Sequence, residues 1–157
     1  MRADHVNAFL TPSVRVIQKM AGVGVRLGPV RRLSQVCLDG NLSILIGLQG
    51  RLCGSVILTA HRDVARALAE RIVGGDLGSE ACSEVKAVLA EVANTIVGNA
   101  TGHLYDLGIR EGITPPTVVE GSSVSLGFGE GVESVLLPLD TDVGRVDMIV
   151  SIARESP

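Results

Sequence analysis

The stretch that decides the fold is Leu33–Thr59, LSQVCLDGNLSILIGLQGRLCGSVILT, in which apolar runs rich in Leu, Ile and Val alternate with short polar breaks. The breaks at Asp39–Asn41 (DGN) and Gln49–Arg51 (QGR) contain the glycine and polar residues that tight turns between antiparallel strands prefer. Leu33–Thr59 therefore predicts a three-stranded antiparallel meander. Thr117–Ala153 repeats the pattern, with glycine-rich breaks between its apolar runs, and predicts a second meander.

Helical periodicity occupies the segments outside these two blocks. Apolar residues recur at helical spacing over three segments: Val6 to about Val25, His61 to about Val73, and Cys82 to about Leu107. A long helix thus precedes each strand block, which predicts two degenerate helix-plus-three-strand repeats. Because an antiparallel sheet offers one face to helices, we expect an α+β fold. The long helices would cover the antiparallel sheet of a single domain over 1–157.

Both long helices are expected to stop at a glycine. Arg26–Gly28 (RLG) and Asp106–Gly108 (DLG) each place Gly where helices commonly end in a left-handed residue. The last strand, Arg145–Ala153 (RVDMIVSIA), is expected at an open edge of the sheet. An uncovered edge is a liability unless it is paired, so we expect a homodimer that continues the sheet across two chains.

Composition limits the function classes open to the chain. It has 157 residues, 46% of them hydrophobic and 2% aromatic, with no Trp, a formal net charge of −3 and a pI near 5.6. Nucleic acids are bound by clusters of Lys and Arg and, when single-stranded, by aromatic platforms, so nucleic acid is not expected as a partner. No apolar run reaches the length of a membrane span or forms a signal core, so we expect a cytoplasmic protein with no membrane contact.

Cysteine and histidine spacing favours structural roles. Cys37, Cys53 and Cys82 lack the spacing of metal ligands and are odd in number, which predicts buried thiols. A redox pair formed by Cys37 and Cys53 on neighbouring strands is the alternative. His103 falls near the apolar side of its helix, which favours a hydrogen-bonded histidine in the core. No metal site and no intrinsic cofactor are expected.

The last helix carries an unusual polar segment, Glu91–Gly102 (EVANTIVGNATG). At about 100° per residue, Glu91 and Asn94 lie about 60° apart and project together from the side opposite the apolar residues. The apolar side holds Val85, Leu89, Val92, Ile96, Ala100 and Leu107. The polar side also holds Glu84, Thr95 and Asn99, interleaved with the small residues Ala87, Gly98 and Gly102.

Two interpretations of this segment stay open. Each glycine inside a helix costs about 1 kcal/mol relative to Ala, so Gly98 and Gly102 indicate that something approaches that side of the helix closely. In the first interpretation another helix of the same protein packs tightly there, and Glu91 and Asn94 are solvated at the edge of the contact. In the second, the face receives a partner and offers it a carboxylate and a carboxamide on a rigid rod.

The sequence around this pair resembles a known family. Ala90–Ala100 (AEVANTIVGNA), followed by Gly108–Gly121 (GIREGITPPTVVEG), resembles the CheX-type members of the CheC/CheX family of chemotaxis phosphatases. That family is marked by Glu-x-x-Asn on a long helix and a downstream Pro. The likeness extends to Val6–Leu10 (VNAFL) and Ile46–Thr59 (IGLQGRLCGSVILT), and so spans nearly the whole chain.

The resemblance implies hydrolysis of the phosphoaspartate on a CheY-like response-regulator receiver domain. By similarity, Glu91 would contact the receiver's Lys, and Asn94 would enter its active site and hold a water in line with the phosphorus. A carboxamide both donates and accepts hydrogen bonds, which suits that task. The receiver would supply the Mg²⁺. The further residues expected to touch the partner are Glu84, Ala87, Thr95 and Gly98.

The chain departs from the family pattern at one position. Family members often carry an acidic or hydroxyl residue where this chain has Ala87. Aligned on the expected terminal glycines, the first helix places Thr11 and Val14 at the positions of Glu91 and Asn94, so a single site is expected, and CheX-like chains resemble homodimers joined through sheet edges. The alternative to a phosphatase is a non-catalytic module of the same fold that docks a receiver or scaffold, similar to flagellar switch components.

Overall fold

The computed structural model describes residues 1–39 and 41–153, and it contains both helices and an antiparallel sheet. Its helices are α1 (Ala3–Ala21), α2 (Arg62–Val73) and α3 (Cys82–Asp106). Its strands are β1 (Val25–Leu27), β2 (Arg31–Leu33), β3 (Val36–Cys37), β4 (Asn41–Gly50), β5 (Gly54–His61), β6 (Glu111–Ile113), β7 (Thr117–Glu120), β8 (Ser125–Leu126), β9 (Val132–Thr141) and β10 (Gly144–Ala153). The turn predicted at Asp39–Asn41 includes Gly40, which lies outside the described residues.

The two strand blocks interlock within one sheet. The hairpins β4–β5 and β9–β10 meet through β5 and β10, and the strand order is β1-β9-β10-β5-β4-β6. The short strands that follow each long helix join the hairpin of the other repeat: β1 and β2 pair with β9, whereas β6 and β7 pair with β4. The α+β fold with two repeats is confirmed. The prediction of two three-stranded meanders is wrong, because the strands that pair with the outer edge of each hairpin come from the other half of the chain.

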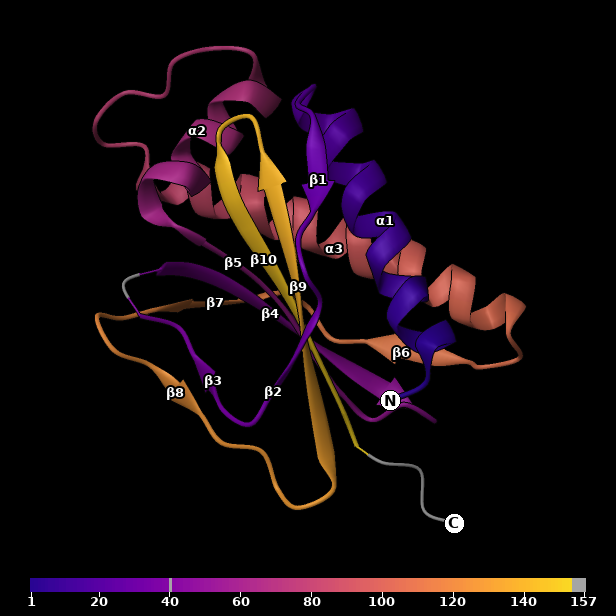
Figure 1. Cartoon of the computed structure of the whole chain (residues 1–157). Helices are drawn as coiled ribbons and strands as arrows, with labels where there is room; N and C mark the ends of the chain where they lie inside the picture. The colour runs from indigo at the N-terminus through magenta and orange to yellow at the C-terminus, as the bar shows by residue number, and fades with distance from the viewer. Residues whose placement is uncertain (40, 154–157) are drawn as a thin grey trace.

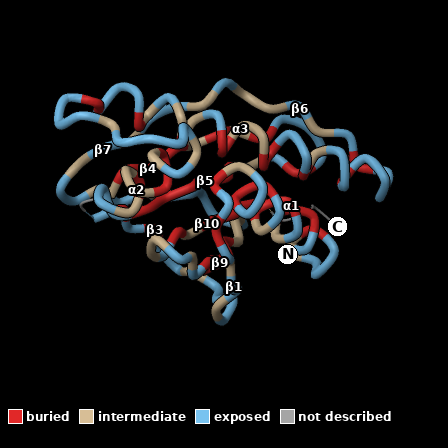
Figure 2. Tube along the Cα trace, turned by 90° about the horizontal axis from the view of Figure 1, so that it is seen from above, coloured by how far each residue is buried: buried red, intermediate tan, exposed pale blue. Residues whose placement is uncertain are grey.

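The sheet has a different cover on each face (Figure 1). Alternation along β9 sends Val135, Leu137 and Leu139 into the core beneath the three helices, whereas Leu136 faces the other way. On that second face a smaller cluster forms under the β3–β8 ribbon, which is a separate two-stranded sheet. Figure 2 shows the buried segments where helices and sheet meet, with exposed turns of the helices outside.

The expected open edge is wrong. Residues 145–153 belong to β10, which pairs with β9 on one side and with β5 on the other along its whole length. The strand is central because both of its neighbours are long hairpin strands that bury apolar side chains on the helix side. An open edge at β10 therefore no longer supports the predicted homodimer, which stays a prediction.

The helix ends differ from expectation at one of the two glycines. α1 stops at Ala21, with Gly22 in the left-handed region at φ 61°, and Gly28 lies beyond β1, where its N–H donates to the Pro138 main-chain oxygen at 2.8 Å. α3 ends as predicted: Gly108 has φ 79°, and hydrogen bonds of 2.9 Å run from the Gly108 and Ile109 N–H groups to the Tyr105 and Leu104 oxygens. This pairing is the Schellman arrangement that glycine favours.

Two further expectations about side-chain burial are wrong. Cys37, Cys53 and Cys82 are all exposed, because they lie in the β3 ribbon, in the β4–β5 turn and at the first residue of α3. His103 is exposed as well, since the buried side of α3 passes through Ala100 and Leu104 instead. Within residues 1–39 and 41–153, the helices are too short or too polar to span a membrane.

Candidate functional site

The outer side of α3 holds the predicted site residues. Its opposite side packs against the sheet and α1 through Val85, Leu89, Val92, Ala93, Ile96, Val97, Ala100 and Leu104. This phase leaves Glu84, Ala87 and Glu91 exposed and Asn94 half-buried, which confirms the predicted division of the helix. Besides His103, Leu107 departs from it: that residue caps the helix and is 49% exposed, because the helix has already ended at Asp106.

Thr95 contributes to the local order around the pair. Its Oγ1 donates to the Glu91 main-chain oxygen at 2.8 Å and lies 3.5 Å from the Glu91 Oε1. A hydroxyl bonded to the preceding turn stays close to the helix surface and leaves the space outside it open. The Asn94 carboxamide makes no hydrogen bond within residues 1–39 and 41–153. Its donor and its acceptor are therefore both available to a molecule that approaches from outside.

Gly98 and Gly102 continue this side of α3 as open surface. A Cβ placed on either glycine would meet no atom within 4 Å. The interpretation that these glycines form a close-packed seam within the chain is therefore wrong, because α1 packs against another side of α3, beside Asn99 and His103. The approach of a partner is the interpretation that remains. We name Glu84, Ala87, Glu91, Asn94, Gly98 and Gly102 together the α3 stripe.

An ion-pair cluster fixes α3 one turn before Glu91. The Lys86 Nζ lies 2.8 Å from Glu120 Oε2 on β7, and Arg62 of α2 lies 3.3 Å from Glu120 Oε1. The hydrogen bond from Lys86 is the main cause that holds the pKa of the Glu120 carboxyl below 4.5, against the effect of its partial desolvation. Sequence reasoning missed this cluster, since its members lie far apart along the chain. It helps to fix the position of the α3 stripe relative to the sheet.

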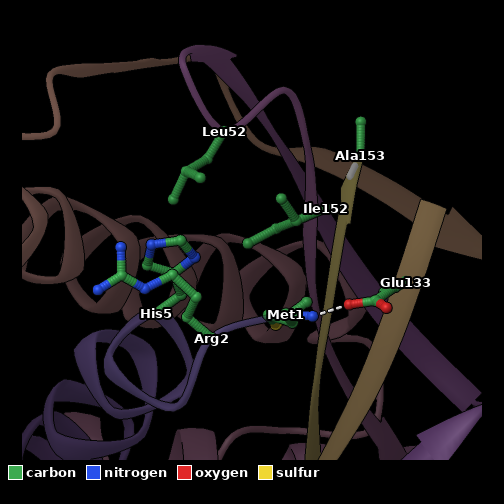
Figure 3. Close-up of a pocket in the computed structure, with 7 residues that line it drawn as sticks. All are labelled: Met1, Arg2, His5, Leu52, Glu133, Ile152 and Ala153. Atoms are coloured by element: carbon green, nitrogen blue, oxygen red, sulfur yellow. Dashed lines mark ion pairs between the residues drawn. The ribbon is translucent and has the colours of Figure 1, made fainter. Parts of the chain in front are cut away.

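A cavity of ≈ 350 Å³ lies elsewhere, where α1 begins (Figure 3). Its walls are formed by Met1, Arg2, His5, Leu52, Glu133, Ile152 and Ala153. The Met1 amino group pairs with Glu133, and His5 is buried. None of the lining residues belongs to α3, so the cavity is separate from the stripe. Across residues 1–39 and 41–153, no group of three or more His, Cys, Asp or Glu side chains is placed to hold a metal ion.

Comparison with known proteins assigns the chain to a family. The model of the family Chemotaxis phosphatase CheX matches residues 42–140, a span that contains both Glu91 and Asn94. The chain belongs to the CheX family. A curated relative is the CheY-P phosphatase CheX of Thermotoga maritima, 27% identical over 130 residues that cover 82% of this chain and 84% of the relative.

Solved structures of CheX and CheC-like proteins share the fold. A CheC-like superfamily protein from Shewanella superposes with a TM-score of 0.86 at 22% identity, covering 97% of this chain and 99% of its own. The CheX–CheY–BeF₃–Mg²⁺ complex from Borrelia burgdorferi gives a TM-score of 0.79 at 24% identity, covering 98% of this chain and 100% of that chain. The CheC-like fold predicted from the sequence is confirmed by these likenesses.

Proposed function

We propose that this chain is a phosphatase that hydrolyses the phosphoaspartate of a CheY-like receiver domain. The observation that carries the proposal is the exposed α3 stripe, where Glu91 and Asn94 stand beside two glycines with open space around them. Membership of the CheX family and the CheY-P phosphatase from Thermotoga maritima support the same activity.

Asn94 is proposed to orient the attacking water. Its unengaged carboxamide can accept a hydrogen bond from the water and donate one to a phosphoryl oxygen. The water oxygen bonds to phosphorus as the bond from phosphorus to the aspartyl oxygen breaks, which gives aspartate and inorganic phosphate, and the proton passes to phosphate or solvent. Phosphoryl transfer depends on positioning and charge neutralisation more than on a strong base, so a neutral group is adequate.

Glu91 is proposed to contact the receiver's Lys and so to set the depth at which Asn94 enters. Its exposed carboxylate is held near Thr95, which limits the directions it takes. Glu84, Ala87, Thr95 and Gly98 are proposed as the surrounding contact residues. The receiver is expected to bring the Mg²⁺, as the Borrelia burgdorferi complex contains CheY, BeF₃ and Mg²⁺ together. When bound there, Mg²⁺ neutralises charge on the phosphoryl oxygens.

The test follows the decay of a phosphorylated CheY-like receiver with and without substoichiometric amounts of this protein. The proposal expects faster decay and multiple turnovers per molecule. A non-catalytic docking module would instead bind the receiver and leave its lifetime unchanged or prolong it. That outcome would replace the phosphatase by the alternative.

A further inference from the structure

The α3 stripe continues past Gly102 into a groove of different chemistry. Tyr105 lies on the same side of the helix and is 60% exposed. Just beyond the helix, the guanidinium carbon of Arg110 lies 5.6 Å from the centre of the Tyr105 ring. These side chains line a groove of ≈ 540 Å³, whose other walls are Gly98, Thr101, Gly102 and Glu111. We call this the Tyr105–Arg110 groove.

The groove is open and keeps a cation available. The Thr101 hydroxyl is turned back to the Gly98 main-chain oxygen at 2.7 Å, so it does not fill the groove. Glu111 is engaged through one oxygen, since its Oε1 accepts from the Leu52 N–H at 2.6 Å, whereas its Oε2 is buried with no hydrogen-bond partner among the described residues. Within residues 1–39 and 41–153, Arg110 forms no ion pair. Tyrosine and arginine are both residue types that are enriched among energetically important interface residues.

The groove begins close to Asn94, so a partner seated on that residue can reach it. At 1.5 Å per residue, Tyr105 is about 17 Å along the helix from Asn94. A specific interface buries about 800 Å² on each partner, a patch about 30 Å across. A patch centred on Asn94 extends about 15 Å along the helix, so it covers the Gly98 end of the groove and stops just short of Tyr105. A receiver whose footprint is displaced slightly toward the C-terminal end of α3 covers the whole Tyr105–Arg110 groove.

We propose that the Tyr105–Arg110 groove is a second contact for the same receiver domain, one that sets affinity and orientation. Arg110 pairs with a carboxylate on the receiver surface, and the Tyr105 ring packs beside it. The surface then carries the carboxylates of Glu84 and Glu91 at one end and, at the other, the Arg110 guanidinium beside the Glu111 carboxylate. Such an arrangement admits one orientation of the receiver and rejects its reverse. The inference rests on the proposed function for the identity of the partner, and it makes Tyr105 and Arg110 positioning residues.

The test uses titration with a CheY-like receiver loaded with beryllium fluoride and Mg²⁺, so that binding is measured apart from hydrolysis. Tyr105→Ala and Arg110→Glu should each raise the dissociation constant by about tenfold, the change expected of important interface residues. The Arg110→Glu loss should shrink at high salt, because it is electrostatic. Phe128→Ala and Arg31→Glu are matched controls, since both side chains are exposed and lie outside α3. These controls should stay within about twofold of wild type.

Kinetics separate positioning from chemistry. Both variants should raise KM, while the single-turnover rate at saturation changes by less than about twofold, since the water-orienting Asn94 is intact. Unchanged dissociation constants for both variants, with melting temperatures equal to wild type, would overturn the inference. A wild-type protein that binds the loaded receiver in a Tyr105-dependent way without hydrolysing it would sink the proposed phosphatase and leave the groove standing. A wild-type protein that fails to bind the loaded receiver would overturn the inference.

Discussion

The helices α1 and α3 open the two repeats, yet they differ at the positions that correspond to Glu91 and Asn94. Left-handed glycines follow both helices, Gly22 after α1 and Gly108 after α3. Aligned on them, His5 and Ala8 take the positions of Glu91 and Asn94. His5 is 4% exposed and Ala8 is 3% exposed, so neither can meet a partner. The same structural element thus serves as buried packing in one repeat and as exposed surface in the other.

The correspondence predicted from the sequence used the wrong glycine. Thr11 and Val14 were expected opposite Glu91 and Asn94 on the assumption that the first helix runs to Gly28, but β1 already precedes that residue. The corrected register still places no carboxylate or carboxamide opposite the pair. A single site therefore remains the prediction for this chain.

α1 does carry Asp4 and Asn7 at the spacing of Glu91 and Asn94, on its exposed side. The Asp4 Oδ2, however, lies 3.5 Å from the Arg2 guanidinium. The pair lines an open pocket whose other walls include His103, Asp106 and Leu107, and no glycine is among the described residues that line it. Residue types and spacing therefore do not make this site on their own, and glycines beside the pair, as at Gly98 and Gly102 on α3, are the second requirement.

The largest effect is expected from a comparison of Asn94 on α3 with Asn7 on α1. Asn94→Asp keeps the size of the side chain but removes its donor and adds a negative charge facing the phosphoryl group, so the rate of receiver dephosphorylation should fall by about 10² or more. Asn7→Asp makes the same chemical change on α1 and should leave the rate unaltered. Stopped-flow decay of the phosphorylated receiver measures both. Equal losses for the two variants would break the distinction between the helices.

A larger side chain should affect binding when it is placed on α3 and stability when it is placed on α1. Gly98→Leu enters open space, so it should not lower the free energy of unfolding, whereas receiver binding should fall by more than about tenfold. Ala8→Leu forces bulk into the core and should cost about 1–3 kcal/mol. Urea unfolding beside a binding titration gives both quantities. A strong loss of stability in Gly98→Leu would return the glycines to a packing role.

Glu91→Ala should give a mixed and smaller effect. It removes the proposed contact with the receiver's Lys, so binding and hydrolysis should both weaken, and the binding loss should shrink at high salt. The folded state should be nearly unaffected, because exposed substitutions move the free energy of unfolding by less than about 0.5 kcal/mol. Dissociation constants at two ionic strengths test this. A salt-independent loss of binding would contradict the charged contact.

The smallest effect concerns how α3 is held in place. Lys86 lowers the pKa of Glu120, so the ionised carboxylate stabilises the fold at pH values above 4.5. That contribution should be lost as the pH falls below 4.5 and through the lowered pKa. Wild type should therefore exceed Glu120→Gln in stability at neutral pH, and the two should converge in acid. Urea unfolding across this pH range decides the point, and a difference that grows in acid would have the wrong sign.

The sequence predicted what depends on local phase and missed what depends on distant pairing. Helical periodicity placed Glu91 and Asn94 on the open side of α3, because a helix sets its faces within a few residues. Strand partners were missed, since β1 and β6 each cross to a hairpin far away in the chain. The Tyr105–Arg110 groove was also missed, because a helical wheel describes only residues within the helix and Arg110 lies beyond the end of α3.

The most direct test of the central claim is the single-turnover dephosphorylation of a receiver by wild-type protein and Asn94→Ala at saturating concentrations, with binding measured separately. We expect Asn94→Ala to bind the beryllium fluoride-loaded receiver nearly as tightly as wild type and to hydrolyse the phosphoaspartate about 10²-fold or more slowly, because a positioning group is lost. Full activity of Asn94→Ala would contradict the account, because the water would then be oriented by some other group.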